Sequence, residues 1–480
     1  MFTRYTYQDW LDEKNKYDFI QQVIRSYKTS AEFKKALEAQ RYFDGDNVEV
    51  SRKYILKANT ISVTDEDTKK VKRQLQHSSV VGNRLANGFF TRAVMQQNQF
   101  LLGNGVRLED QGQKNQLGPS FDKALEALGE YALVQGVSWG YWNLDHLEVI
   151  PAATDKASGF VALLDEMTGE PMLGIQFWQI SQKRSMYVRL FEPDGVTLLK
   201  ENEDRVMVEE EQKIPYVRNT FKDGAGETVV SAQNYAFLPV VPLYANKRKE
   251  SELTPPIKSK IDCYDRIASD FADNLDRAND VYWVLTNFGG GTAEVLEMLE
   301  QINKIKAVVN QGDGMGNASA EPKTIEVPYE ARKTALEILR NALFEDYMAL
   351  DMHSITGGSL TNVAIEAATA DLNMKANGYE WQVFMFVQKV LSLIGIHTEA
   401  ITFKRQSISN ANEIIEAIYM AAEDLPRRKR LELNPYVSED EVKKLMEELD
   451  IEETTARKAS QQRILEEQKR LQKITQPLEV

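Results

Sequence analysis

The chain has 480 residues, 42% of them apolar, a formal net charge of −14 and a single cysteine, Cys263. Its length allows about two to four folding units, and its acidic balance argues against tight wrapping of nucleic acid. One cysteine excludes an internal disulfide framework and a cysteine-based zinc site, which suits assembly in a reducing, intracellular place. The N-terminus lacks the apolar core of a signal peptide, and no run approaches the length of a transmembrane helix.

The first half of the chain changes character once. Residues 6–40 and 66–101 mix apolar and charged positions and predict mostly helical structure. Residues 131–245 instead contain short β-branched or aromatic runs separated by Gly, Pro and Asp. Such runs predict strands joined by tight turns.

Residues 254–283 predict one long helix. Thr254 suits the N-cap and Pro255 the first helical position. Apolar residues recur in steps of three or four, at positions 257, 261, 264, 268, 271, 275, 278 and 282. Six aspartates lie mostly off this stripe and predict an acidic flank: Asp262, Asp265, Asp270, Asp273, Asp276 and Asp280.

The second half predicts a small α/β insert between helices. Residues 284–327 contain a strand-like "VLTNF", a short helical stretch, a glycine-rich turn and a return strand "KTIEV", after which helix resumes to residue 350. A charge-free joint follows, since no Asp, Glu, Lys or Arg occurs from Met352 to Ile365. A second long helix is predicted from Asn362 to Ile394, with a kink at Gly378. Residues 410–449 predict two or three short helices, and the last thirty residues predict a loose helix or a disordered tail.

Motifs for catalysis and for cofactors are absent from the sequence. There is no Walker A motif, and the glycine clusters at 288–294 and 312–317 lack dinucleotide-binding spacing, so they are interpreted as loops. The four histidines have no metal-ligand spacing, no Gly-x-Ser-x-Gly elbow occurs, and Cys263 is interpreted as a buried structural thiol. We therefore expect no enzyme, no catalytic residue, no metal and no cofactor.

Two basic clusters have open interpretations. Lys247, Arg248 and Lys249 precede the long helix, and residues 427–430 form the run "RRKR". Either cluster could contact phosphate or form a solvated charged surface.

The order of these parts resembles the portal (connector) proteins of tailed double-stranded DNA bacteriophages. The resemblance covers about residues 40–435 and is carried by several segments in the right order. These are "GNRLANGFFTRAVMQQNQFLLGNGV" (82–106), "FLPVVPLYANKRKESEL" (237–253), "IDCYDRIASDFADNLDRANDVYWVLTNFGG" (261–290) and "TNVAIEAA" (361–368). In the last segment Asn362 stands where the family usually has Gly, and Asn can also cap a helix.

The resemblance implies an α+β, mainly helical, ring-forming fold with named parts. In this sequence they are a wing (1–246), a stem helix (247–284), a clip (285–327), a second stem helix (328–350), a tunnel loop (351–361), a kinked wing helix (362–404) and a crown with a polar tail (405–480). The tunnel loop would line the DNA channel with Ser354, Ile355, Thr356, Gly357, Gly358, Ser359, Leu360, Thr361 and Asn362. Clip candidates for partner contacts are Lys304, Lys306 and Lys323, for which solvated surface is the alternative.

The resemblance also implies partners and a location. Twelve copies would form a ring at one capsid vertex of the virion, after assembly in the host cytoplasm. Double-stranded DNA would pass through the ring during packaging and ejection. The terminase large subunit, a head–tail adaptor, and the major capsid and scaffolding proteins would contact it, and no membrane is involved. The alternatives are another ring-forming head–tail connector, a minor capsid protein or, less well supported, a packaging nuclease or ATPase subunit.

Overall fold

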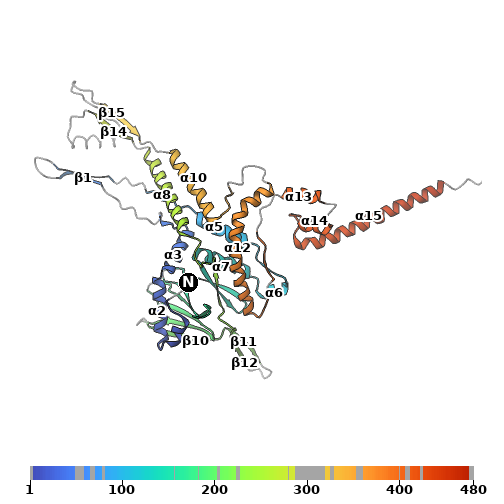
Figure 1. Ribbon diagram of the computed structural model, residues 1–480, viewed down its shortest axis with the longest axis horizontal. Helices are drawn as coiled ribbons and strands as arrows, with labels where there is room; N and C mark the ends of the chain where they lie inside the picture. Colours follow the sequence, from blue (N-terminus) through green and yellow to red (C-terminus); the bar gives the residue numbers. More distant parts are fainter. Residues whose placement is uncertain are drawn as a thin grey trace, which may run out of the picture. The chain divides into compact units, whose positions relative to one another are not determined.

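The computed structural model describes residues 4–48, 59–64, 71–77, 82–155, 157–181, 183–202, 206–222, 228–278, 281–286, 319–324, 329–352, 361–398, 400–405, 411–421 and 425–474. The chain forms two compact units. The large unit comprises residues 1–350 and 371–406, and the small unit comprises residues 351–370 and 407–480. Figure 1 traces their elements in chain order. The mixed α/β composition predicted from the sequence is confirmed.

Three short helices open the large unit: α1 (Tyr7–Asp12), α2 (Lys16–Thr29) and α3 (Ala31–Phe43). Each helix has an N-cap residue whose side chain accepts a hydrogen bond from a backbone N–H of the first turn. These N-cap residues are Thr6, Asn15 and Ser30. Their apolar faces share a core with a β-sheet, in which Tyr27 packs edge-on against Phe33 and Phe177. The helices predicted over residues 6–40 are confirmed.

Two antiparallel sheets follow. Five strands form a meander in the order β10-β9-β8-β7-β6, with bounds β6 (Gly159–Leu164), β7 (Pro171–Trp178), β8 (Tyr187–Glu192), β9 (Gly195–Glu201) and β10 (Met207–Ile214). Three strands form the second sheet in the order β13-β4-β5, with bounds β4 (Val137–Asn143), β5 (His146–Pro151) and β13 (Val240–Tyr244). Trp139, Phe160 and Phe191 belong to one buried cluster, so the two sheets share a core.

A helical core covers the second sheet. It includes α5 (Phe89–Leu102), α7 (Phe121–Gln135) and the 371–393 part of α12 (Asn362–Leu393). A Cβ atom at Gly140 of β4 would lie 2.6 Å from the Phe386 ring, so glycine is what lets α12 approach the sheet. The short α6 (Gln111–Gln116) lies between α5 and α7 in sequence, and β3 (Val106–Leu108) pairs with β16 (Ile401–Phe403).

Two long helices of the large unit lie side by side, α8 (Pro255–Ala278) and α10 (Tyr329–Tyr347) (Figure 1). They are antiparallel, because Phe271 contacts Tyr329 at one end and Lys260 pairs with Asp346 at the other. The helix predicted to reach residue 283 instead ends at Ala278, and β14 (Val281–Thr286) follows. Strand β14 pairs with β15 (Ser319–Thr324). The return strand predicted at 323–327 therefore begins earlier, at Ser319.

Two further hairpins are β1 (Asn59–Thr64) with β2 (Val71–His77), and β11 (Val217–Lys222) with β12 (Thr228–Gln233). The β1–β2 hairpin corrects the helix predicted over residues 66–101, because residues 71–77 form strand β2 and helix α5 begins only at Phe89. Cross-strand pairing decides the conformation of "VKRQLQH", and local composition does not reveal that pairing.

The small unit contains α13 (Ala411–Met420), α14 (Arg427–Leu433) and α15 (Glu439–Ile474). At the start of α15, the Glu441 carboxylate accepts two hydrogen bonds from Ser438, from its N–H at 3.1 Å and from its hydroxyl at 2.8 Å. The last of the short helices predicted within 410–449 is instead the start of α15, which continues to Ile474, so the helical alternative for the last thirty residues is confirmed up to that residue. None of the helices described above has both the length and the apolarity to span a bilayer.

Candidate functional site

Side chains on α8 form a ladder of hydrogen-bond acceptors. The N–H of Asn87 donates to Asp265 Oδ1 at 2.9 Å, that of Leu85 to Ser269 Oγ at 2.9 Å, and that of Asn83 to Asp273 Oδ1 at 2.8 Å. The acceptors are four residues apart on the helix, while the donors are two residues apart on an irregular segment. We call Asn83–Asn87 the strap.

The spacing of the ladder has a simple geometric cause. Four residues of α-helix rise about 6.0 Å, and two residues of extended chain rise about 6.6 Å. Every second N–H of the strap therefore meets one turn of α8, with the two segments running in opposite directions. The helix provides the acceptors that a neighbouring strand would otherwise provide.

This ladder corrects the prediction of a continuous acidic flank on α8. Asp265 is only 1% exposed and Asp273 only 8% exposed, so these carboxylates bind the strap. Asp262 accepts a hydrogen bond from the Tyr42 hydroxyl, and Asp270 is exposed. The side chain of Asp276 and the whole of Asp280 lie outside the described residues.

Burial acts on the pKa of one ladder residue, Asp265. Desolvation raises the pKa of Asp265. Hydrogen bonds from the Asn47 amide at 2.5 Å, and from the backbone and side-chain N–H groups of Asn87, oppose this rise. These hydrogen bonds make Asp265, in the middle of α8, the residue that holds Asn47 and Asn87 against this helix.

A buried ion pair lies where α10 ends. Lys375 of α12 is 2.8 Å from Glu252, which precedes α8, and each side chain is 12% exposed. The same ammonium donates to the Tyr347 carbonyl at 2.8 Å and lies 3.2 Å from the centroid of the Tyr347 ring. Burial lowers the pKa of Lys375, and the charge of Glu252 opposes this shift. One cation thus ties α12 to the last residue of α10 and to the segment that starts α8.

Two tyrosines extend this network to α5. The Tyr347 hydroxyl donates to Gln97 Oε1 at 3.0 Å, and the Tyr379 hydroxyl donates to Asn98 Oδ1 at 3.4 Å. Burial raises the pKa of both tyrosines, so both are neutral donors. The sequence reasoning missed this network, although its α5 members lie in the segment "QQNQ" that the resemblance included.

The beginning of the charge-free joint is fixed by α5. Gln96 Nε2 donates to the Leu350 carbonyl at 3.1 Å, while the Leu350 N–H donates to Gln96 Oε1 at 2.9 Å. Just before it, Met348 has a φ of 62°, and the Met348 and Ala349 N–H groups close the C-terminus of α10 on Glu345 and Phe344. This is a Schellman ending with methionine in the left-handed position that usually takes glycine.

The end of the joint is fixed within the small unit. The N–H of Ala364 donates to Thr361 Oγ1 at 3.3 Å, so Thr361 is the N-cap of α12 and Asn362 is its first helical residue. The Asn362 N–H donates to Glu413 Oε2 of α13 at 2.6 Å. Ser354, Ile355, Thr356, Gly357, Gly358, Ser359 and Leu360 lie outside the described residues.

The other predicted residues are dispersed. Lys247, Arg248 and Lys249 form an exposed turn, in which Lys249 has a φ of 60° and lies over the Tyr244 ring. Lys323 lies in β15 opposite Tyr282, whereas Lys304 and Lys306 lie outside the described residues. Cys263 is half-buried, which corrects the prediction of a buried thiol.

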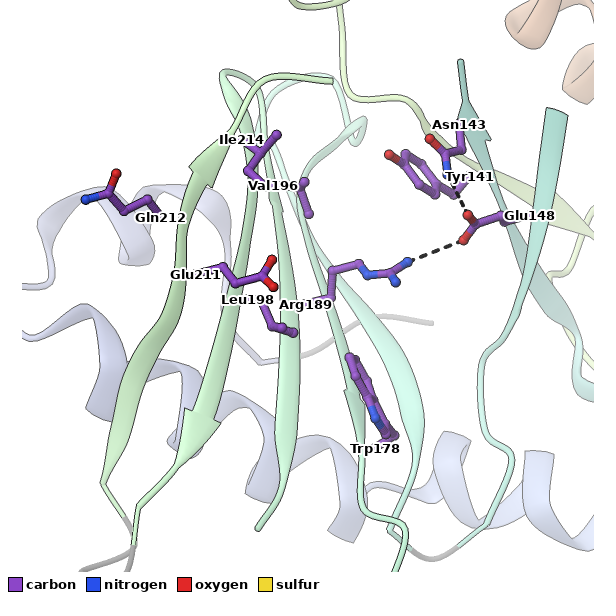
Figure 2. Close-up of a pocket in the computed structure, with 10 residues that line it drawn as sticks. All are labelled: Tyr141, Asn143, Glu148, Trp178, Arg189, Val196, Leu198, Glu211, Gln212 and Ile214. Carbon is purple, nitrogen blue, oxygen red and sulfur yellow. Dashed lines mark hydrogen bonds and ion pairs between the residues drawn. The ribbon is translucent and has the colours of Figure 1, made fainter. Parts of the chain in front are cut away.

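A pocket of about 310 Å³ lies between the two sheets (Figure 2). The Glu148 carboxylate accepts from Asn143 at 2.7 Å and from Arg189 at 3.3 Å, and Trp178 and Tyr141 line the same space. Its lining has no Ser, Thr, Cys, His or Lys, and its carboxylates are those of Glu148 and Glu211. Within the part of the chain that the structure describes, no group of His, Cys, Asp and Glu is arranged to hold a metal ion.

These features define a mixed α/β protein in which polar networks fix both ends of an uncharged joint. Comparison with known families makes the assignment specific. The chain belongs to the family "Phage portal protein, SPP1 Gp6-like", whose model matches residues 26–473. The resemblance inferred from the sequence is thereby confirmed.

Individual relatives are more distant. The portal protein of Clostridium phage phiCD119 is 26% identical over 228 residues, which cover 46% of this chain and 50% of the relative. The portal protein of Bacillus phage SPP1 is 25% identical over 231 residues, or 44% of each chain. The matched region thus spans about half the length of these relatives. A chain in a solved structure described as the "Virion of native gene transfer agent (GTA) particle" is 11% identical, with a TM-score of 0.40, over 74% of this chain and 91% of that chain.

Proposed function

We propose that the chain assembles into a ring, a dodecamer in the virion, through which double-stranded DNA is packaged and ejected. Family membership supports a portal role in a phage particle. The observation that carries the channel assignment is the joint from Met352 to Ile365, which has no Asp, Glu, Lys or Arg. Leu350 just before it is hydrogen-bonded to α5, and Asn362 within it is hydrogen-bonded to α13.

The lack of charge in this joint suits contact with DNA that moves through the ring. Each contact between a basic side chain and a phosphate adds affinity, and a ring would repeat that contact once per subunit. The charge-free part of the tunnel loop, with Ser354, Thr356, Gly357, Gly358 and Ser359, would touch DNA weakly enough to let it slide. Because Asp265 and Asp273 are occupied by the strap, weak binding depends more on the loop than the sequence alone suggested.

The fixed ends give the loop a defined place in each subunit. Gln96 fixes the residue before the loop through two hydrogen bonds, and Lys375 fixes the last turn of α10. In a ring, such anchors would present every copy of the loop at the same radius. Residues 247–284 and 328–350 then serve as stem, residues 285–327 as clip, and residues 405–480 as crown.

The partners follow from this role as part of the proposal. The clip would dock the terminase large subunit during packaging and a head–tail adaptor afterwards, and the wing would face the major capsid and scaffolding proteins. Neither the family description nor the names of the relatives include an enzymatic activity. The role requires no cofactor.

The loop assignment is tested by replacing Gly357 and Gly358 with Pro in the full-length protein. Rings should persist while DNA packaging falls, because proline restricts the backbone that must adjust as DNA advances. Normal packaging by this variant would contradict the assignment. ATP hydrolysis or metal-dependent DNA cleavage by the pure chain would favour a packaging enzyme instead, and rings without a hole of DNA width would favour another connector.

A further inference from the structure

Most of α15 lies outside the core of the small unit. Every residue from Ile451 to Arg470 is exposed, although the helix is continuous from Glu439 to Ile474. A helix that buries no face gains little from packing, and side-chain pairs such as Glu453–Arg457 at 3.3 Å add only about 0.3–0.5 kcal/mol each. We call residues 451–470 the arm.

The arm carries one pair of adjacent aliphatic residues, and two acids follow it. Ile464 and Leu465 are 56% and 54% exposed, and Glu466 and Glu467 follow them directly. Neighbouring arm positions are largely polar or charged, as in "SQQR" before the site and "QKR" after it. Two aliphatic side chains beside two carboxylates favour a partner that is apolar with a basic rim.

The small unit contains a pocket of that chemistry. It has a volume of about 290 Å³, and Ile415, Ile418, Leu431 and Leu449 provide an apolar lining. Arg427 and Arg430 lie at the same pocket. Arg427 pairs with Glu453 at 3.1 Å, whereas the buried Arg430 Nε has no hydrogen-bond partner among the residues that the structure describes. An unpaired buried donor is costly and favours an anionic partner.

A chain cannot fill its own pocket with this site. Leu449 lines the pocket, and Ile464 lies fifteen residues further along the same continuous helix, or about 22 Å away. The pocket that this site can occupy is therefore that of another copy. Such a contact joins two different surfaces, and its repetition closes a ring where the rotation between copies closes.

We propose that the Ile464–Glu467 site of one copy docks in the α13–α14–α15 pocket of the next copy. This inference rests on ring assembly in the proposed function. Ile464 and Leu465 enter the apolar lining, and Glu466 or Glu467 pairs with Arg430. The contact links successive crowns around the ring.

The test is to dilute purified rings of the wild type and of each variant, and to measure by mass photometry the protein concentration at which the rings dissociate. The variant with Ile464→Glu and Leu465→Glu should dissociate at a protein concentration about tenfold or more above that of the wild type. Arg430→Glu should have a similar effect, because it opposes the two carboxylates. Combining Arg430→Glu with Glu466→Arg and Glu467→Arg should restore most of the resistance to dilution.

Ile451→Glu is the matched control. Ile451 is 64% exposed on the same helix, yet it lies outside the pocket lining and the docking site, so its substitution should leave the dilution curve unchanged. The arm variants alter only exposed side chains, so they test the contact even where Arg430→Glu disturbs the pocket. Wild-type resistance to dilution in the arm variants would overturn the docking contact while leaving the ring intact. A wild-type chain that forms no rings would overturn both the contact and the proposed function.

Discussion

The ladder between α8 and the strap makes a sharp prediction for Asp265→Ala. The substitution removes an acceptor from the Asn87 N–H at 2.9 Å, and from the side-chain amides of Asn47 and Asn87, each at 2.5 Å. Each buried donor left without a partner costs about 1–3 kcal/mol. The Asn47 amide keeps its bond to the Asn87 carbonyl at 3.3 Å, so two donors are left unpaired and the free energy of unfolding should fall by about 2–6 kcal/mol.

Asp270→Ala is the matched control for this substitution. Asp270 lies on the same helix but is exposed, so its replacement should change stability by no more than about 0.5 kcal/mol. Urea denaturation at a fixed protein concentration measures both variants. Hydrogen exchange of the peptide that contains the strap localises the effect, because the amides of Asn83, Leu85 and Asn87 should lose protection only in Asp265→Ala.

The two interpretations of the α8 aspartates differ in this assay. If the aspartates formed a uniform exposed flank, both substitutions would have the same small effect. Equal urea midpoints for the two variants, together with unchanged exchange in the strap, would therefore refute the ladder.

Three further predictions concern the large unit. Because burial raises the pKa of Asp265, the folded state binds the proton of this carboxyl group more tightly than the unfolded state does. The stability of the wild type relative to Asp265→Asn should therefore fall as the pH rises from 3.8 through the raised pKa. A difference in urea midpoint that is independent of pH would contradict this prediction. Lys375→Met should cost about 1–3 kcal/mol, because it removes the cation beside the largely buried Glu252, which keeps only its hydrogen bond from Asn246 at 3.0 Å. The double variant with Glu252→Gln should lose less than the sum of the two single variants, and additive losses in urea titrations would exclude the coupling. Gly378→Ala should stabilise the chain by up to about 1 kcal/mol, because a Cβ there meets nothing within 4 Å, and a lowered melting temperature would show that α12 needs glycine at this position.

Local pattern predicted two of the long helices well. Thr254 and Pro255 placed the start of α8, and α12 was predicted from Asn362 to Ile394 against the observed end at Leu393. The apolar stripe of α8 and its capping residues are local properties of the sequence, whereas α15 was not predicted as one long helix.

Features that depend on distant partners were not predictable in the same way. The four-residue spacing of Asp265, Ser269 and Asp273 is visible in the sequence, but their burial depends on a strap 178 residues away in the case of Asp265 and Asn87. The helix predicted over residues 66–101 was wrong for β2 for the same reason, since only pairing with β1 makes that segment a strand.

The candidate site was predictable only in part. The uncharged joint was evident from composition, whereas its anchors were not, because Gln96 and Leu350 are 254 residues apart. Lys375 and Glu252 would each have been placed on the surface from their type alone, since charged residues are rarely buried unless paired. The N-cap of α12 proved to be Thr361, one residue before the asparagine that the resemblance emphasised.

Electron microscopy of the purified full-length protein tests the channel assignment most directly. The account predicts closed rings with an axial hole wide enough for B-form DNA, and with residues 354–360 at its narrowest point. Monomers or dimers at all concentrations, or rings whose axis is filled, would contradict it.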